Sequence, residues 1–304
     1  MLITYLKLLM TAVFWGGTFI SGRMLVDSVP PFSAAFFRFL FASICLFAFA
    51  TRRTGKIPRL KKGQLLPVAL LGLTGVFAYN VLFFNGLKWI PAGRASIIIA
   101  NNPIVISVLS ALFFRESLSA VKVVGILISV FGAIIAISGG DPLALFAGGI
   151  GKGDLFIGGC VISWSVYSLL GKRVMRDLSP LTAVSYSAAI GAAALLIPAC
   201  MEGMLSAAPG YSLVDWGNLA YLGWFGTVLG FVWYYEGIRS IGPSRASLFI
   251  NFVPISAIVL AHLILKEPVT LSLLTGAVLV VVGVTLNHLP LSGWRLSKSK
   301  TLSR

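Results

Sequence analysis

The sequence predicts an all-α integral membrane protein with ten transmembrane helices, arranged as two inverted five-helix repeats. Of its 304 residues 58% are apolar and only 11% are charged, and the mean hydropathy is +0.95. A soluble domain is about 45–50% apolar and ~25% charged, so this composition excludes a water-soluble enzyme. The low charge and the 12% of aromatic residues also exclude a disordered chain.

Ten apolar stretches, each near the ~20 residues that a membrane-spanning helix needs, follow one another along the chain. Turn or charge signals separate them: Pro30-Pro31, the basic run 52–62, Pro91-Ala92-Gly93, Gly139 to Pro142, Ser179-Pro180, Gly242-Pro243 and Glu267-Pro268. The expected spans are 4–26, 32–50, 65–87, 91–113, 119–138, 154–174, 180–201, 215–238, 244–265 and 271–290.

The basic residues predict the orientation of these spans. Of the 24 Lys and Arg residues, five (Arg23, Lys88, Arg94, Lys152 and Lys266) fall on one side, Arg38 lies within a span, and the other 18 fall on the opposite side. Cytoplasmic loops are rich in Lys and Arg, so we expect an inner (plasma) membrane location with both termini cytoplasmic and residues 291–304 as a basic cytoplasmic tail. The net charge of +15 then indicates contact with membrane lipids rather than with nucleic acid.

An internal repeat relates the two halves, predicted as 1–140 and 150–290. Residues 86–132 align with 237–283 at an offset of 151, and the identities include Gly86/Gly237, Arg94/Arg245, Pro103/Pro254, Glu116/Glu267 and Gly132/Gly283. At an offset of 149, Trp15 aligns with Trp164. Because five spans is an odd number, the second half must enter the membrane inverted. Inverted repeats are typical of secondary transporters, whose sites lie near the midplane at the repeat interface.

These residues resemble the EamA-type, ten-helix branch of the drug/metabolite transporter superfamily over about residues 5–290. The features that carry the resemblance are Phe14-Trp15-Gly16-Gly17-Thr18-Phe19, Phe37-Arg38-Phe39, Gly93-Arg94-Ala95-Ser96 with Asn102-Pro103, and Ser244-Arg245-Ala246-Ser247 with Val253-Pro254. The resemblance implies export of amino acids, other small metabolites or toxic compounds through a central cavity, with spans 5 and 10 at the periphery.

Segments interrupted by proline occur at matching positions of the two halves, and such segments also indicate a binding site near the midplane. Polar and aromatic residues near that depth predict an aromatic-walled substrate site for a small amphipathic or zwitterionic solute: Trp15, Thr18, Tyr79, Asn80, Asn101, Asn102, Trp164, Tyr167, Thr227 and Asn251. Hinge or gate roles fall to Pro103, Pro254, Arg94, Arg245, Glu116 and Glu267, although interfacial anchoring explains the four charged residues equally simply. We expect Arg38 to extend its charge outward to the membrane surface.

The function expected from the sequence is therefore secondary transport, with export of small metabolites such as amino acids by alternating access. A multidrug or toxic-compound exporter and a nucleotide-sugar-like carrier remain alternatives, and an integral membrane enzyme is a remote one. No metal-ligand motif, nucleotide loop or catalytic arrangement is present, so we expect neither enzyme activity nor a cofactor or metal. No carboxylate falls at the bilayer centre, which favours facilitated transport or a peripheral proton site such as Glu236. Glycines repeating every seven residues in spans 5 and 10 favour close packing within the fold or in a homodimer.

Overall fold

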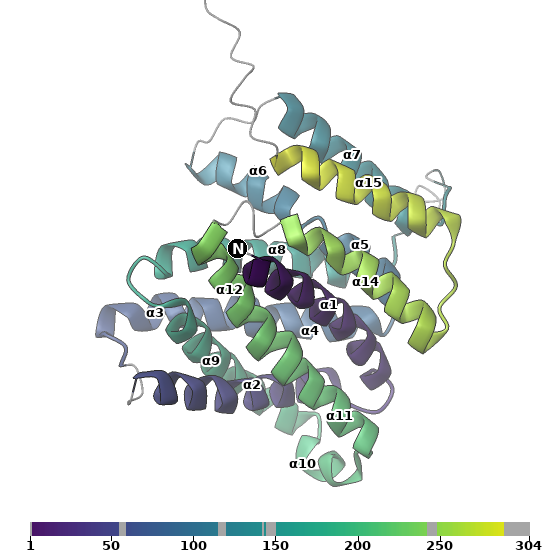
Figure 1. Cartoon of the computed structure of the whole chain (residues 1–304). Coiled ribbons are helices and arrows are strands. Elements are labelled where there is room, and N and C mark those ends of the chain that lie inside the picture. Colours follow the sequence, from purple (N-terminus) through teal and green to yellow (C-terminus); the bar gives the residue numbers. More distant parts are fainter. Residues whose placement is uncertain are drawn as a thin grey trace, which may run out of the picture.

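The computed structural model describes residues 2–54, 59–114, 120–141, 143, 150–241 and 248–288. All regular elements of this described part are helices (Figure 1). The first half comprises α1 (Leu2–Leu25), α2 (Pro31–Thr54), the run α3 (Lys62–Leu71), η1 (Gly72–Ala78) and α4 (Tyr79–Leu87), the pair α5 (Ala92–Ile99) and α6 (Asn102–Phe114), and α7 (Ala120–Ile137).

The second half repeats this order. It comprises α8 (Lys152–Val174), α9 (Pro180–Met201), the run α11 (Leu213–Tyr221), η4 (Leu222–Leu229) and α12 (Gly230–Ile241), the run η5 (Leu248–Asn251), α14 (Phe252–Leu260) and η6 (Ala261–Leu265), and α15 (Leu271–His288). Two short elements, α10 (Met204–Ala207) and η3 (Ala208–Gly210), connect α9 to α11.

These helices confirm the predicted all-α membrane fold, whereas the count of ten spans is only partly confirmed. Six helices of the described residues are long and apolar enough to cross a membrane, and two shorter apolar helices cover 249–265 and 271–286. Of the two remaining predicted spans, the fourth is divided between α5 and α6, and the eighth runs from α11 through η4 to α12.

The packing of the two halves shows their two-fold relation. α1 packs against α12 and α14 of the other half, and α8 packs in turn against α4 and the α5–α6 pair (Figure 1). α2 packs against its counterpart α9, and α7 against its counterpart α15. Exchanging the halves therefore reproduces each contact, and spans 1, 3, 4, 6, 8 and 9 come together in the middle of the molecule.

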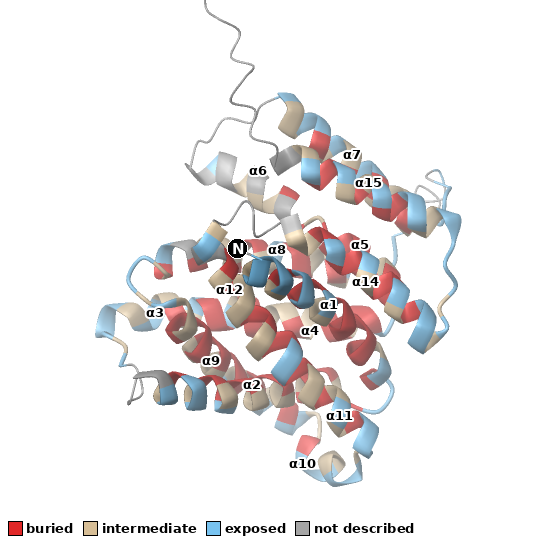
Figure 2. Ribbon diagram, in the orientation of Figure 1, coloured by how far each residue is buried: buried red, intermediate tan, exposed pale blue. Residues whose placement is uncertain are grey.

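The peripheral position of α7 and α15 follows from their side chains. Their glycine-lined faces meet each other, while large apolar residues such as Leu127, Phe131 and Val278 are exposed (Figure 2). Exposed apolar surface of this kind is stable against lipid tails and not against water. These two helices thus form a lipid-facing pair beside the centre of the fold.

The prolines interrupt the fourth and ninth spans as predicted. Because Pro103 lacks an N–H, α5 ends at Ile99 and α6 begins only at Asn102. The side-chain amide of Asn101 donates to the carbonyl oxygen of Ile97 at 3.0 Å and so satisfies one acceptor beside the break. In the second half a short 3₁₀ turn, η5, precedes Pro254.

The third and eighth spans both contain a π-helical segment, at matching positions of the repeat. These segments are η1 and η4. A π-helical turn frees side chains and carbonyl groups from the regular α-helical register and is often found at functional sites. The sequence did not predict this feature, because it arises from how the spans pack.

Candidate functional site

Six aromatic side chains meet where the two halves join, and we call them the aromatic cluster: Trp15, Tyr79, Trp164, Tyr167, Phe231 and Tyr234. The repeat-related indoles of Trp15 and Trp164 lie edge to face with ring centroids 6.2 Å apart. Trp164 also contacts Tyr79 at 5.5 Å and Tyr167 at 5.1 Å, and Trp15 contacts Tyr234 at 5.2 Å. Four of the predicted site residues are thus brought together.

Polar groups orient the aromatic cluster. The indole N–H of Trp15 donates to the carbonyl oxygen of Gly226 at 3.0 Å, and the hydroxyl of Thr18 donates to the carbonyl oxygen of Trp15 at 2.6 Å. The hydroxyl of Tyr235 donates to that of Tyr167 at 3.4 Å. A wall of tyrosine and tryptophan offers apolar area together with a few hydrogen-bonding groups, which suits an amphipathic solute.

Glycines on the two π-helical segments and just beyond allow this close packing. An ideal Cβ on Gly230 would lie 2.5 Å from the indole nitrogen of Trp15, and one on Gly75 would collide with the ring of Tyr167. The aromatic side chains therefore rest directly on the backbone of the third and eighth spans. Movement of either span would move the cluster.

Arg38 is the main residue whose position the sequence predicted wrongly. We expected its charge to reach the membrane surface, but the residue is only 5% exposed. Its Nε donates to the hydroxyl of Thr227 at 3.1 Å, and its Nη1 donates to the amide oxygen of Asn80 at 3.0 Å. The reason is that α2 packs against α4 and η4, which places these two acceptors in reach of the guanidinium. Asn80 and Thr227, both predicted site residues, thus lie together around Arg38.

The three predicted asparagines at the helix breaks have separate environments. The amide oxygen of Asn101 accepts a hydrogen bond from the hydroxyl of Ser129 on α7 at 2.8 Å, and the amide of Asn251 donates to the hydroxyl of Thr285 on α15 at 3.3 Å. Asn102 is buried, and its amide oxygen has no hydrogen-bond partner among the described residues. Asn101 and Asn251 therefore bond to the peripheral pair α7 and α15, so a role for them in substrate contact stays a prediction.

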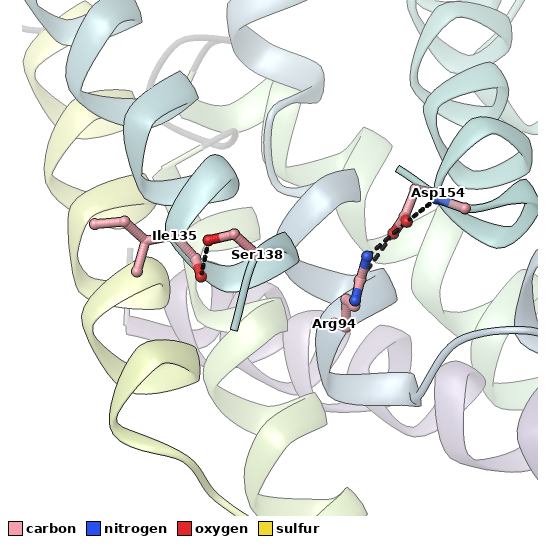
Figure 3. A network of polar contacts seen from close by, with 5 residues as sticks. Arg94, Ile135, Ser138 and Asp154 are labelled. Carbon is pink, nitrogen blue, oxygen red and sulfur yellow. Dashed lines mark hydrogen bonds and ion pairs between the residues drawn. The ribbon is translucent and has the colours of Figure 1, made fainter. Parts of the chain in front are cut away.

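Charged residues connect the central helices at the ends that the charge pattern predicts to face outward, and we call these the outer ends. The carboxylate of Glu267 accepts hydrogen bonds from the backbone N–H groups of Ala92 and Gly93, with N···O distances of 3.0 and 3.2 Å, and so caps the N-terminus of α5. A carboxylate at a helix N-terminus is stabilised by the helix dipole. Arg94, one residue further along α5, forms a two-point ion pair with Asp154 at the start of α8, at 2.8 and 2.6 Å (Figure 3).

These contacts link helices to one another, which interfacial anchoring alone would not do. Glu267 joins the end of η6 to α5, and Asp154 joins α8 to α5. The counterparts on the other side of the repeat, Arg245 and Glu116, lie outside the described residues. Pro254 is buried within α14.

The described residues hold no group of three or more His, Cys, Asp or Glu side chains that could bind a metal ion. Sequence reasoning missed Arg38, Phe231 and Asp154 as parts of this region. A signal for Arg38 was present, because an ionisable residue inside a span is a functional candidate by default. Phe231 and Asp154 carry no such signal, since phenylalanines are common in every span and an acidic residue after a loop suits any helix N-terminus.

Known proteins resemble the chain over most of its length. The EamA-like transporter family matches residues 2–138 and 151–289. A Bacillus subtilis protein named uncharacterized transporter YyaM is 30% identical over 281 residues, covering 92% of each chain. An Archaeoglobus fulgidus protein named uncharacterized transporter is 30% identical over 280 residues, covering 92% of this chain and 96% of its own.

One solved crystal structure has the same fold, with a TM-score of 0.67 at 20% identity over 93% of this chain and 96% of that chain. The predicted resemblance is confirmed by the family match, and these relatives are named as transporters and not as enzymes. The chain therefore belongs to the EamA-like transporter family of the drug/metabolite transporter superfamily, and it is a multi-pass membrane transporter.

Proposed function

We propose that the protein is a secondary transporter that exports small amphipathic metabolites, amino acids first, across the inner membrane by alternating access. The observation that carries this proposal is the aromatic cluster at the junction of the two halves. It combines a tryptophan from each half with tyrosines of the third, sixth and eighth spans. A solute bound there would contact both halves and would respond to their relative movement.

The contacts at the outer ends support the alternating part of the proposal. The Glu267 cap and the Arg94–Asp154 ion pair close α5 against η6 and α8 on the side that the charge pattern assigns to the outside. Both contacts depend on hydrogen-bond distances, so a small separation of the helices would break them. The helix breaks beside Pro103 and Pro254 would absorb the change in direction of the fourth and ninth spans.

Counterflow into proteoliposomes tests the proposal. The purified protein is reconstituted with an unlabelled amino acid inside, and uptake of the same labelled amino acid is measured for an aromatic, a hydroxylated, a thiol-containing and a charged member. Trp164→Ala removes the residue with the most contacts in the aromatic cluster. At about 25 cal/mol per Å² of apolar area, losing half of an indole contact weakens binding by roughly tenfold or more.

The matched control is Trp224→Ala, because Trp224 lies on η4 but is 48% exposed on its outer surface. Saturable counterflow of one amino acid that is lost in Trp164→Ala and kept in Trp224→Ala supports the proposal. Absence of counterflow for all four amino acids contradicts amino-acid transport and favours drugs, nucleotide sugars or other metabolites as the substrate. Linear, non-saturating flux contradicts alternating access itself.

A further inference from the structure

Arg38 is a buried cation whose charge no described carboxylate balances. Of the nine Asp and Glu residues in the sequence, all except Glu116 lie in the described part, and the ion pairs there join Lys7 to Glu236 and Arg94 to Asp154. A charge in the membrane interior without a counter-ion is costly, so its retention usually marks a pathway or a ligand.

Two neutral side chains hold the guanidinium in place. The amide of Asn80 donates to the carbonyl oxygen of Val76 at 2.8 Å, and the hydroxyl of Thr227 donates to the carbonyl oxygen of Leu222 at 2.9 Å. Their donors are therefore engaged by η1 and η4, and their oxygens face Arg38. The π-helical segments of the third and eighth spans thus converge on one positive charge.

The third nitrogen of Arg38 has no acceptor among the described residues. This nitrogen, Nη2, lies 3.7 Å from the point where a Cβ on Gly226 would stand. The carbonyl oxygen of Gly226 in turn accepts the indole N–H of Trp15. An anionic group placed against Nη2 would therefore lie beside the aromatic cluster.

The depths of the two features suit one small molecule. Arg38 is seven residues into α2, about 10 Å from its outer end at 1.5 Å per residue, and Trp15 is ten residues, about 15 Å, from the outer end of α1. A solute with an acidic group and an apolar body could contact both at once. A guanidinium also forms strong charge-assisted hydrogen bonds to a carboxylate, and Nη2 carries N–H donors for this purpose.

We propose that Arg38 binds the carboxylate of the transported solute while the aromatic cluster binds its apolar part. Asn80 and Thr227 are positioning residues that aim the guanidinium. This inference rests on the proposed function and narrows the substrate class to small carboxylates, including zwitterionic amino acids. A solute that is cationic overall, without an acidic group, would be repelled by Arg38.

The test uses binding, so that it does not depend on transport. The shift in thermal unfolding midpoint of the detergent-solubilised full chain is measured with three matched pairs, each an acid and its primary amide: tryptophan, phenylalanine and phenylpropionate. Wild type is compared with Arg38→Met and Arg38→Lys. The control is Arg23→Met, because Arg23 lies near the outer end of α1 and donates instead to the backbone carbonyl oxygen of Leu87 at the end of α4.

We expect acids but not amides to stabilise wild type and Arg23→Met. Arg38→Met should bind the acids at least about tenfold more weakly, the usual effect of losing a charge-assisted bond, and Arg38→Lys should recover part of the affinity. Equal binding of acids and amides, unchanged acid binding by Arg38→Met, or the absence of any shift overturns the inference. So does an equal shift with chloride alone, which would assign Arg38 to an inorganic anion.

Counterflow of the same compounds separates this inference from the proposed function. Saturable transport of the amides as well as the acids would keep the transporter proposal and refute the carboxylate site. Binding of the acids without counterflow would keep the carboxylate site and refute the proposed transport of these compounds. If Arg38→Met does not fold, the comparison of wild type with Arg38→Lys across the acid and amide pairs still tests whether Arg38 binds the carboxylate.

Discussion

A single methyl group at Gly283 should separate the peripheral helices α7 and α15. An ideal Cβ on Gly283 would lie 2.5 Å from the carbonyl oxygen of Gly125 and 2.5 Å from the backbone nitrogen of Ser129. Both are backbone atoms, so no rotation of a side chain can relieve the overlap. Gly283→Ala therefore tests whether backbone contact between these helices supports the fold.

The size of the effect follows from these distances. Ordinary van der Waals contact begins at 3.4 Å, so the helices must move apart by about 0.9 Å. Overpacking of a close-packed contact costs typically 1–3 kcal/mol, and a gap of 0.5–1 Å forfeits about a quarter to a half of the dispersion energy along the seam. We expect Gly283→Ala to lower the free energy of unfolding by about 2–3 kcal/mol.

Gly158→Ala in α8 is the matched control, because no heavy atom lies within 4 Å of its ideal Cβ. Alanine in an open helical position stabilises by up to about 1 kcal/mol, so the free energies of unfolding of the two variants should differ by about 2–4 kcal/mol. Equilibrium unfolding in mixed detergent micelles, followed by circular dichroism, measures the difference. Equal stability of the two variants would refute the reasoning, because it would mean that the helices are not in backbone contact.

Two further variants address the outer contacts. Glu267→Gln leaves one neutral acceptor for the N–H groups of Ala92 and Gly93, so the outer side should open more often. A membrane-impermeant thiol reagent should then modify a cysteine at the buried position Ile90 (Ile90→Cys) several-fold faster than it does when Glu267 is present. An unchanged rate would argue against a gate. Asp154→Asn leaves the partly buried Arg94 without its ion partner and should lower the free energy of unfolding by about 2–3 kcal/mol in the same assay. A loss below about 1 kcal/mol would mean that this pair contributes no more than an ordinary surface ion pair.

The outer contacts also illustrate what a charge pattern leaves open. From the sequence, Arg94 and Glu267 are equally explained as anchors at the membrane surface, because only their depth is visible. The structure directs both toward other helices: Glu267 to the first N–H groups of α5 and Arg94 to Asp154. Depth depends on position along one span, whereas the partner depends on which spans are neighbours.

The sequence by itself determined the membrane fold, the repeat and the family. Composition and span length place the chain in lipid, where its backbone hydrogen bonds must be satisfied within helices. The matching Arg, Pro and Glu residues reveal the duplication. The proline breaks were predictable for the same local reason, since Pro103 cannot donate to the carbonyl oxygen one turn earlier. Trp15 and Trp164 were predictable as a pair because the repeat relates them.

Only the tertiary structure decided what surrounds each polar group. Arg38 looked like a residue that extends to the membrane surface, and it is instead enclosed by Asn80 and Thr227, which are 42 and 189 residues away in sequence. Asn101 was predicted as a substrate contact from its depth alone, and only the structure shows that its amide oxygen accepts a hydrogen bond from the hydroxyl of Ser129 on α7. A side chain's depth is a local property of one span, but its partners are set by packing between spans, which no pattern along a single helix encodes.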